Sequence, residues 1–489
     1  MVEKKKQGRS ASSSLCSLTT SLNMVVGTVV LAWIVMVVLQ HQVQPTFHSC
    51  DTYLPWKGSS IVGIGGSVAN FIKKEGFMAL ISDVWDILRT ELHFGMSDPN
   101  IEGKHFLALG GGYFGAHFVQ RVKAMGGSIT LIDDIKVKAK VESYVDEFIG
   151  IENYGAVSLT QSETIINIVK NHPVKFDAVF TLVEDQTILV ATLCEAIGCE
   201  ASPLSASIVA RDKAAFRTAM REAGIPAPQS KIIHSMDDIV ASKNFPFPAF
   251  LKPNYGVAAY YSSKVNNFTH LQETYASFAQ LMNPDSMSIY HAGMDMQLEQ
   301  LLVGDEIQLE VIVHKGEVVF HSFSGQYATD RKWLVYPVVL SEAQQTAIVD
   351  MVKRTVKAVG LTTGIVHFEL FIEQGSEVPW VIELNNRLSR GFLCQRLTHQ
   401  ILIGRTNIDY LKAVLYTSLG LHPMLPTRHT NIFAISVFPD LPSKVGWETH
   451  GPCAVFAADT PENALTQGLH YVEDHPQPAP VDQIHPHEL

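Results

Sequence analysis

Two apolar stretches toward the C-terminus each carry a carboxylate in their middle, and this pattern constrains the fold more than any other feature. Glu369 lies in the stretch HFEL, and Glu383 lies in VIELN, two residues before Asn385. Residues two apart in a strand point to the same face of a sheet, so Glu383 and Asn385 share a face. Acids are rarely buried unless they are paired or bind a cation. Oxygen donors without cysteine or histidine suit Mg²⁺, and we predict that Glu369, Glu383 and Asn385 bind it; an ion-pair network within the sheet is the alternative.

Apolar stretches of strand length occur in two arrangements. In the first, strands at 104–109 and 128–134 flank a helix in a βαβ unit, and a strand at 177–183 leads into a helix that ends at Gly198. This order predicts a small doubly wound parallel sheet. In the second, a helix over 207–223 precedes strands separated by helices, which predict an α+β region with a largely antiparallel sheet. These strands are 247–253, 296–302, 306–314, 317–324, 365–372 and 379–385.

Two lysines on separate elements are placed to flank a polyphosphate. Lys213 lies near the start of the predicted helix over 207–223, and Lys252 lies on a predicted strand, where Pro253 fixes it. Gly256 and the small residues after it allow a loop to close over phosphate oxygens. We therefore predict that Lys213 and Lys252 bind the phosphates of a nucleotide; two surface lysines are the alternative.

The segment after Lys252 also offers groups for a base and a ribose. Residues 299–302 form an acidic and apolar connection, suited to a flat base whose edge is read by backbone groups. Glu306 is placed to accept hydrogen bonds from ribose hydroxyls, with a solvated strand end as the alternative. Arg387 falls on the face of Asn385 and would meet the charge that develops on a transferred phosphoryl group. The predicted ATP-binding residues of this segment are Glu299, Gln300, Leu302 and Glu306.

The glycine run at 110–115 offers a competing interpretation. It fits G-x-G-x-x-G between a predicted strand and a predicted helix, and Asp133 and Asp134 lie near the position of a ribose-binding acid. Taken alone, it indicates an NAD(P)-dependent oxidoreductase. We favour a tight turn that lets a helix pack on a sheet, because an oxidoreductase would make no use of the predicted metal ligands.

Several short motifs follow one another in a fixed order along the chain. They are RDK at 211–213, GIPAP at 224–228, PAFLKP at 248–253, GVAA at 256–259, LEQLL at 298–302, GDE at 304–306, HFEL at 367–370 and IELNNR at 382–387. Together, in this order, they resemble the ATP-grasp superfamily across roughly residues 105–425.

The resemblance implies a pre-ATP-grasp α/β domain with a doubly wound parallel sheet, followed by a two-lobed ATP-grasp module. It also implies a ligase in which a carboxylate attacks the γ-phosphate of ATP and an amine then captures the acyl phosphate, with Mg²⁺ or Mn²⁺ bridging the phosphates. The partners would be a small-molecule carboxylate and a small-molecule amine. A catalytically lapsed, membrane-tethered nucleotide-binding protein is a further alternative, against which the retained lysines, metal ligands and Arg387 argue.

Two segments bear on the substrates. KPNYGVAAYYSS, from Lys252 onward, looks most like the K-P-x-x-G-A-A-S loop of L-amino-acid ligases and carnosine-synthase-type enzymes, with Tyr260 in place of the expected serine. The carboxylase branch is disfavoured, since its glycine-richer phosphate loop is missing. Residues 325–333 are predicted to form a loop, and in similar ligases this stretch lines the acyl-substrate pocket. Arg331 would then pair with a substrate carboxylate and Asp330 with an amino group, whereas a solvated charged loop is the alternative.

The N-terminus departs from the pattern of a soluble enzyme. Residues 22–39 carry no charge, and these eighteen residues would span about 27 Å as a helix, enough to cross a hydrocarbon core. We predict a single-pass membrane anchor; a signal peptide and a buried helix are the alternatives. The basic flank would send the rest of the chain across the membrane, whereas use of ATP favours the cytoplasm, so the sequence leaves the side open.

Charge and cysteine content argue against nucleic-acid binding and against a zinc or redox role for the cysteines. A net charge of −11 provides no basic surface for nucleic acid. Among six cysteines only Cys194 and Cys199 are close in sequence, their spacing fits no zinc or redox motif, and a disulfide framework is not expected. The two substrates and the oligomeric state are left open. The predicted segments are a basic, Ser/Thr-rich segment (1–21), the anchor (22–39), a linker and helical preface (40–100), the pre-ATP-grasp domain (101–205), the ATP-grasp domain (206–425), a small C-terminal extension (426–473) and a disordered tail (474–489).

Overall fold

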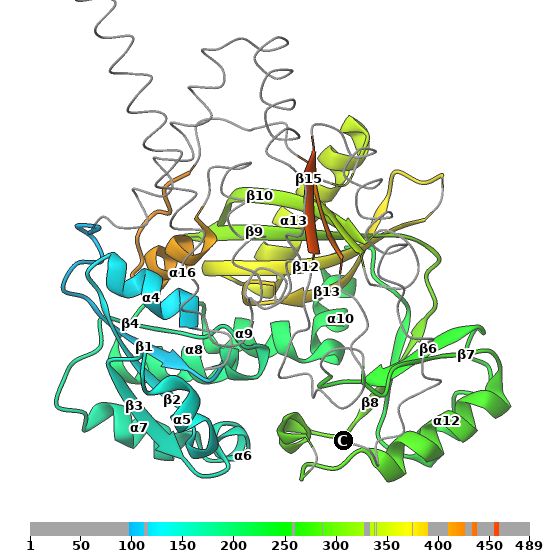
Figure 1. The fold of residues 1–489 in the computed structure, drawn as a ribbon. Helices are drawn as coiled ribbons and strands as arrows, with labels where there is room; N and C mark the ends of the chain where they lie inside the picture. Colours follow the sequence, from blue (N-terminus) through cyan, green and yellow to red (C-terminus); the bar gives the residue numbers. More distant parts are fainter. Residues whose placement is uncertain are drawn as a thin grey trace, which may run out of the picture. The chain divides into compact units, whose positions relative to one another are not determined.

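The computed structural model describes most of the chain beyond residue 96 (Figure 1). The described residues belong to one compact unit that begins at Ser67. The predicted anchor at 22–39 lies outside them, as do Asp330, Arg331 and the tail at 474–489. No helix within the described part is long and apolar enough to cross a membrane. The described ranges are 97–111, 116–256, 260–285, 287–326, 333–336, 338, 340–373, 375–389, 409–425, 433–437 and 454–458.

The first part of the described chain is a parallel sheet with helices on both faces. Its elements are β1 (His105–Leu109), α4 (Ala116–Ala124), β2 (Ser128–Asp134), β3 (Glu147–Ile151), α6 (Tyr154–Thr160), α7 (Ser162–Lys170), β4 (Ala178–Phe180), the 3-10 helix η2 (Glu184–Gln186) and α8 (Thr187–Ile197). The strand order is β3-β2-β1-β4, and every pair is parallel. Alternate residues of β1 point to opposite faces, so Phe106 packs with α4 whereas Leu107 packs with α7 and α8. The predicted doubly wound sheet is thereby confirmed.

The single helix predicted over 207–223 is wrong in one respect, because the chain breaks it in two. Helix α9 (Leu204–Arg211) ends and α10 (Lys213–Glu222) begins around Asp212, whose backbone is extended. The Asp212 side chain accepts a hydrogen bond from the backbone N–H of Ala215 at 2.9 Å, as an N-cap does. The aspartate side chain hydrogen-bonds nearby backbone groups and so favours a helix N-cap over the interior of a helix. This preference explains why the chain breaks the helix at Asp212.

The cysteines also differ from expectation. Cys194 in α8 forms a disulfide with Cys199, and their Cα atoms are 4.5 Å apart. Gly198, in a left-handed conformation, ends α8 and turns the chain back so that the two side chains meet.

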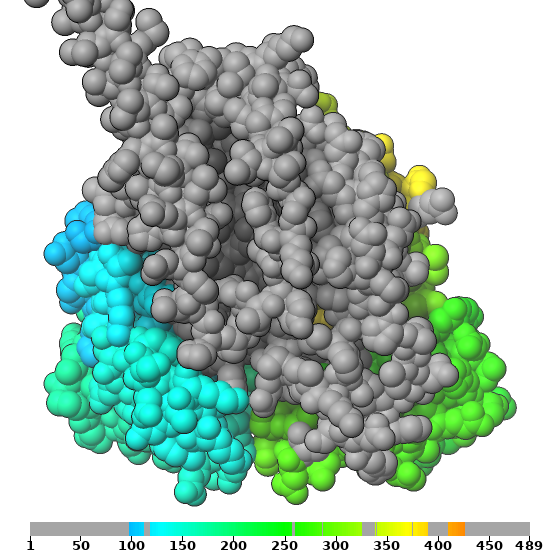
Figure 2. All heavy atoms as spheres, in the orientation of Figure 1, coloured from blue at the N-terminus to red at the C-terminus, as the bar shows by residue number. Residues whose placement is uncertain are grey.

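A small antiparallel sheet follows. It contains β5 (Ser230–Ile233), β6 (Ala249–Pro253), β7 (Ser263–Val265) and β8 (Met296–Gln300), in the order β5-β8-β6-β7. Helix α12 (Phe268–Leu281) and the 3-10 helix η3 (Ser288–Ala292) contribute to its core, in which Leu251, Leu271 and Leu298 are fully buried. Atoms of this region are green in the space-filling view, and those of the parallel sheet are blue to cyan (Figure 2).

A large antiparallel sheet carries the remaining strands. They are β9 (Gly304–His314), β10 (Glu317–Gln326), β11 (Trp333–Tyr336), β12 (Thr363–Glu373), β13 (Pro379–Asn385), β14 (Phe433–Val437) and β15 (Ala454–Ala458), in the order β13-β12-β9-β10-β11-β14-β15. The combination of a parallel sheet with antiparallel sheets confirms the predicted fold class. The bounds of the predicted domains stay a prediction.

Helices cover both faces of the large sheet, but not evenly. One face packs on α13 (Glu342–Val359) through apolar side chains that include Leu309 and Phe368. On the other face, α16 (Tyr410–Ser418) packs on Ile312 and Ile365, near one end of β9 and β12. The opposite ends of these strands carry polar side chains on that face, and they form the candidate site.

Candidate active site

The three predicted metal ligands lie on one face of the large sheet. Glu369 on β12 is the direct register partner of Glu383 on β13, and Asn385 follows two residues later on the same face. The register therefore brings together residues that are up to sixteen positions apart in sequence, through antiparallel pairing whose register shifts just after Glu369.

The donor set fits a hard divalent cation. Like charges directly opposite each other in an antiparallel pair are destabilising, and Glu369 and Glu383 hold that position with side chains only 31% and 21% exposed. Lys213 Nζ lies 3.3 Å from Glu383 Oε1 and supplies part of the missing positive charge. Two carboxylates and an amide oxygen are ligands that Mg²⁺ prefers. No group of three His, Cys, Asp or Glu side chains in the described part is placed to hold a metal.

A buried histidine lies beside these acids. His367 Nδ1 is 2.6 Å from Glu310 Oε1, and His367 Nε2 is 3.7 Å from Glu369 Oε1. Burial alone would lower the pKa of His367, but Glu310 and Glu369 raise it to about 9. The backbone N–H of Ser389 donates to the second oxygen of Glu310 at 3.2 Å. The pair of Glu310 and His367 joins β9 to β12 beside the predicted metal ligands, and the sequence analysis did not predict it.

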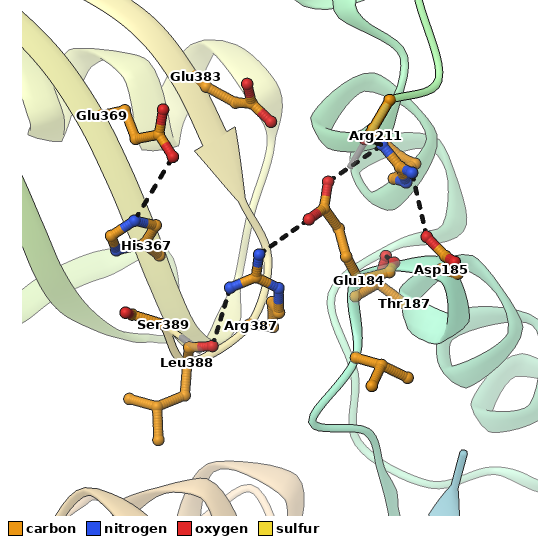
Figure 3. A network of polar contacts seen from close by, with 12 residues as sticks. Glu184, Asp185, Thr187, Arg211, His367, Glu369, Glu383, Arg387, Leu388 and Ser389 are labelled. Atoms are coloured by element: carbon orange, nitrogen blue, oxygen red, sulfur yellow. Dashed lines mark hydrogen bonds and ion pairs between the residues drawn. The ribbon is translucent and has the colours of Figure 1, made fainter. Parts of the chain in front are cut away.

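Glu184, which follows β4 of the parallel sheet, contacts residues of this site. It is the first residue of η2, and its carboxylate lies 3.0 Å from Arg211 Nη1 and 2.8 Å from Arg387 Nη2 (Figure 3). With the Asn385 amide oriented so that its nitrogen faces Glu184, that nitrogen donates to both carboxylate oxygens, at 2.8 and 3.1 Å. Burial would raise the pKa of Glu184, but Arg211 and Arg387 hold it below its usual value.

Sequence reasoning missed Glu184 and its neighbour Asp185, whose Oδ1 is 3.1 Å from Arg211 Nη2. A usable signal was present. The two acids follow a buried strand of a parallel sheet, and ligands of such sheets bind beyond the carboxyl ends of the strands.

Lys252 is held by a buried ion-pair network. Its Nζ lies 2.7 Å from Glu299 Oε2, and Arg217 Nε lies 2.7 Å from Glu299 Oε1. Arg217 Nη2 also donates to the carbonyl oxygen of Ile382, next to Glu383, at 2.5 Å. Burial would raise the pKa of Glu299, but Arg217 and Lys252 lower it. Both oxygens of Glu299 are therefore engaged by cations, and the side chain holds Lys252 in place; the predicted part of Glu299 in ATP binding stays a prediction.

The predicted phosphate loop begins at a fixed point. Tyr255 Oη donates to Asp212 Oδ2 at 2.9 Å, and Asn254 Oδ1 accepts from the backbone N–H of Ala214 at 2.8 Å. Arg211 Nη1 donates to the carbonyl oxygen of Gly256 at 3.2 Å. The start of the loop is thus tied to the break between α9 and α10, where Lys213 also lies. Residues 257–259 are outside the described part.

The other predicted nucleotide residues lie at the end of β8, near the start of β9 and in the connection between these two strands. Gln300 ends β8 and its backbone N–H donates to the Gln229 carbonyl at 2.8 Å. Leu302 lies half-buried in the connection between β8 and β9. Glu306 is on β9, where its Oε1 accepts from Gln308 Nε2 at 3.1 Å. Gln308 is the register partner of Glu369, so Glu306 lies on the face of the predicted metal ligands.

The glycine run supports the tight-turn interpretation where the structure describes it. Gly110 and Gly111 have positive φ of 65° and 73°, which glycine adopts without strain. A Cβ at Gly110 would lie 3.2 Å from Val183 Cγ2, so the turn passes close to the chain that precedes η2. Asp134 caps a short 3-10 helix by accepting from the backbone N–H of Lys136 at 3.0 Å. Gly112 to Gly115 lie outside the described residues.

Comparison with known proteins identifies similar sequences and folds. Residues 245–394 match a family model described as an ATP-grasp domain. Carnosine synthase 1 of Gallus gallus is 23% identical over 354 residues, which cover 67% of this chain and 36% of that protein. D-alanine–D-alanine ligase of Pseudomonas putida (strain GB-1) is 24% identical over 213 residues, covering 41% of this chain and 62% of that protein. The chain thus spans less than two thirds of either relative.

A solved structure shares the fold over a longer range. The crystal structure of an L-amino acid ligase from Bacillus licheniformis superposes with a TM-score of 0.61 at 17% identity, covering 76% of this chain and 98% of that one. The nicotinamide alternative gains no support from these similarities.

Proposed function

We propose that this chain, whose residues 245–394 match an ATP-grasp domain, is an ATP- and Mg²⁺-dependent ligase that activates a carboxylate as an acyl phosphate and joins it to an amine. The observation that carries the proposal is the pairing of Glu369 with Glu383 across β12 and β13, with Asn385 on the same face. Lys213 forms an ion pair with Glu383, and Arg387 forms an ion pair with Glu184.

Each part of the site has a role in that chemistry. Lys213 and Lys252 bind the phosphates of ATP, and Glu306 binds its ribose. Glu369, Glu383 and Asn385 hold Mg²⁺, for which Mn²⁺ can substitute. When bound, this metal neutralises charge on the phosphate oxygens. Gln300 and Leu302 lie where backbone groups can read the base.

The reaction takes place in two steps, formation of the acyl phosphate and attack by the amine. A carboxylate oxygen of the first substrate attacks the γ-phosphorus, and the bond from that phosphorus to ADP breaks. The amine nitrogen then attacks the acyl carbon, the carbon–oxygen bond breaks, and inorganic phosphate leaves with the oxygen while the amine loses a proton. The Arg387 guanidinium, always charged, stabilises the negative charge of the transferred group.

The substrates we propose are amino acids or small peptides. The names of the similar proteins support this class, since they include carnosine synthase, D-alanine–D-alanine ligase and L-amino acid ligase. Tyr260 stands where the corresponding loop of L-amino-acid ligases is expected to have a serine. This difference bears on which amino acid or peptide the protein uses as substrate. We assign recognition of the acyl substrate to Asp330 and Arg331.

The test is release of ADP in the presence of Mg²⁺ and pairs of amino acids. We expect ADP only when both an acid and an amine are supplied, with a peptide product of matching mass. ADP formation that no amino acid stimulates would contradict the substrate class. Binding of ATP without any turnover would favour a nucleotide-binding protein that has lost catalysis.

We also propose that residues 22–39 anchor the chain in a membrane. The proposal rests on the uncharged stretch of eighteen residues.

A further inference from the structure

We propose that Glu184 is a positioning residue, which holds Asn385 and Arg387 in the arrangement that metal binding and turnover require. The inference rests on the proposed function and adds to it a residue from the parallel sheet.

The backbone around Glu184 is fixed at the end of the parallel sheet. Thr181 Oγ1 donates to the carbonyl oxygen of Leu109 at 2.8 Å and so joins the end of β4 to the end of β1. Thr187 Oγ1 donates to the carbonyl oxygen of Glu184 at 3.0 Å. From β1 the chain adds β2 and β3 on one side and then β4 on the other side, so a topological switch point lies between β1 and β4. Ligands of such sheets bind in the crevice outside the carboxyl ends of the strands at this point. Glu184 therefore projects from a rigid base toward the reacting groups.

Its carboxylate has no capacity left for a substrate. A carboxylate accepts about four hydrogen bonds. Glu184 accepts hydrogen bonds from Arg387 Nη2 and, at both oxygens, from the Asn385 amide nitrogen, and it forms an ion pair with Arg211 Nη1, while its side chain is only 9% exposed. All of these donors come from side chains of this chain. Glu184 must consequently act through the residues that it holds.

Two of those residues are parts of the proposed site. With its nitrogen fixed on Glu184, the Asn385 amide has its oxygen on the other side, free of this contact. The Arg387 guanidinium is held at both ends, because Nη1 donates to the Leu388 carbonyl at 3.0 Å and Nη2 pairs with Glu184 at 2.8 Å (Figure 3). Loss of a partner that orients a metal ligand typically weakens metal binding by about 10–100-fold.

The third residue leads to the nucleotide loop. Arg211 pairs with Glu184 and donates to the Gly256 carbonyl through the same nitrogen, Nη1, at 3.0 and 3.2 Å. One carboxylate thus connects the metal strand β13, the arginine and the start of the loop that follows Lys252.

The test is metal affinity, which needs no knowledge of the substrates. We would measure the Kd of Mn²⁺ for the full chain with saturating ADP, from the signal of free Mn²⁺ in electron paramagnetic resonance. Glu184→Gln keeps the shape but turns one acceptor oxygen into a donor that faces arginine and amide N–H groups. We expect it to weaken Mn²⁺ binding by about tenfold or more. The Kd of ADP measured without metal should stay near the wild-type value.

The matched control is Asp409→Asn. Asp409 forms a comparable buried ion pair, 2.7 Å from Arg121 Nη2, and joins α4 to α16 away from the site. Both variants should unfold at lower denaturant concentration than wild type, but Asp409→Asn should bind Mn²⁺ as wild type does.

The outcomes separate the two proposals. A folded Glu184→Gln protein with wild-type Mn²⁺ affinity overturns the positioning role, and so does an equal loss in Asp409→Asn. If Glu184→Gln does not fold, Glu184→Asp decides, because it keeps the charge but withdraws the carboxylate by one methylene; unchanged Mn²⁺ binding in that variant overturns the role. A wild-type chain that binds neither ADP nor Mn²⁺ overturns the proposed function instead.

Discussion

Replacing Glu299 by glutamine removes the one carboxylate that both Lys252 and Arg217 contact. The two contacts are 2.7 Å each, and all three side chains are less than 10% exposed. The substitution keeps the size of the side chain, so it creates no cavity. It leaves two buried cations without the carboxylate that both of them contact.

The expected loss in the free energy of unfolding follows from the burial of the three side chains. Breaking a buried ion pair by removing one partner costs about 3–5 kcal/mol of the free energy of unfolding. Glutamine retains one acceptor oxygen, so we expect about 3 kcal/mol. With a slope of up to about 3 kcal/mol per molar in urea, the unfolding midpoint should fall by about 1 M or more. The exposed pair of Asp350 and Arg354, 3.9 Å apart, offers a control: Asp350→Asn should change stability by no more than about 0.5 kcal/mol.

The assay is urea unfolding of both variants and wild type as a function of pH. The pKa of Glu299 in the folded state lies below its ordinary value of 4.5. Its stabilisation is therefore fully present above pH 4.5 and is lost as the pH falls through the folded-state pKa. The difference between wild type and Glu299→Gln should be constant near neutral pH and shrink in acid. A difference below 1 kcal/mol at pH 7, or one that grows as the pH falls, would refute the reasoning.

Three further predictions concern the site and its attachment. Glu383→Gln should leave the fold intact but abolish Mg²⁺-dependent ADP release, because one negative ligand is lost while the shape is kept; near-wild-type ADP production would remove the metal assignment. Arg331→Ala should raise the KM for the acid or amine substrate far more than the KM for ATP, since it removes binding of one ligand only. Equal effects on both KM values would move the search for substrate contacts to loops of the parallel sheet. Deleting residues 1–45 should yield a soluble, active protein, measured by ADP release after ultracentrifugation; a truncated chain that stays with membranes would show that residues 22–39 are not the sole attachment.

The strands could be predicted from sequence because their signals are local. The predicted strand at 128–134 coincides with β2, and that at 379–385 coincides with β13. The acids at Glu369 and Glu383 stood out because they interrupt apolar stretches, and antiparallel pairing placed them opposite each other. β3 was missed, since EFIGI is largely half-buried or exposed and carries no strong alternation.

Interactions between distant segments could not be predicted in the same way. Glu184 lies 203 positions from its partner Arg387, and nothing in the local sequence indicates which arginine a buried acid contacts. Glu299 was assigned to the base as part of an acidic and apolar connection, and the sequence did not indicate that its side chain pairs with Arg217 on α10 and Lys252 on β6. The break at Asp212 is a local signal that could have been recognised, because aspartate favours helix N-caps over helix interiors.

The central claim is that the carboxylate substrate is activated by phosphoryl transfer, and an isotope experiment tests it most directly. The carboxylate substrate is labelled with ¹⁸O in both oxygens and turned over with ATP, Mg²⁺ and the amine. The account predicts one ¹⁸O atom in each inorganic phosphate released, because the acyl carbon–oxygen bond breaks when the amine attacks. Phosphate without label, or label found in AMP, would contradict an acyl phosphate and with it the proposed reaction.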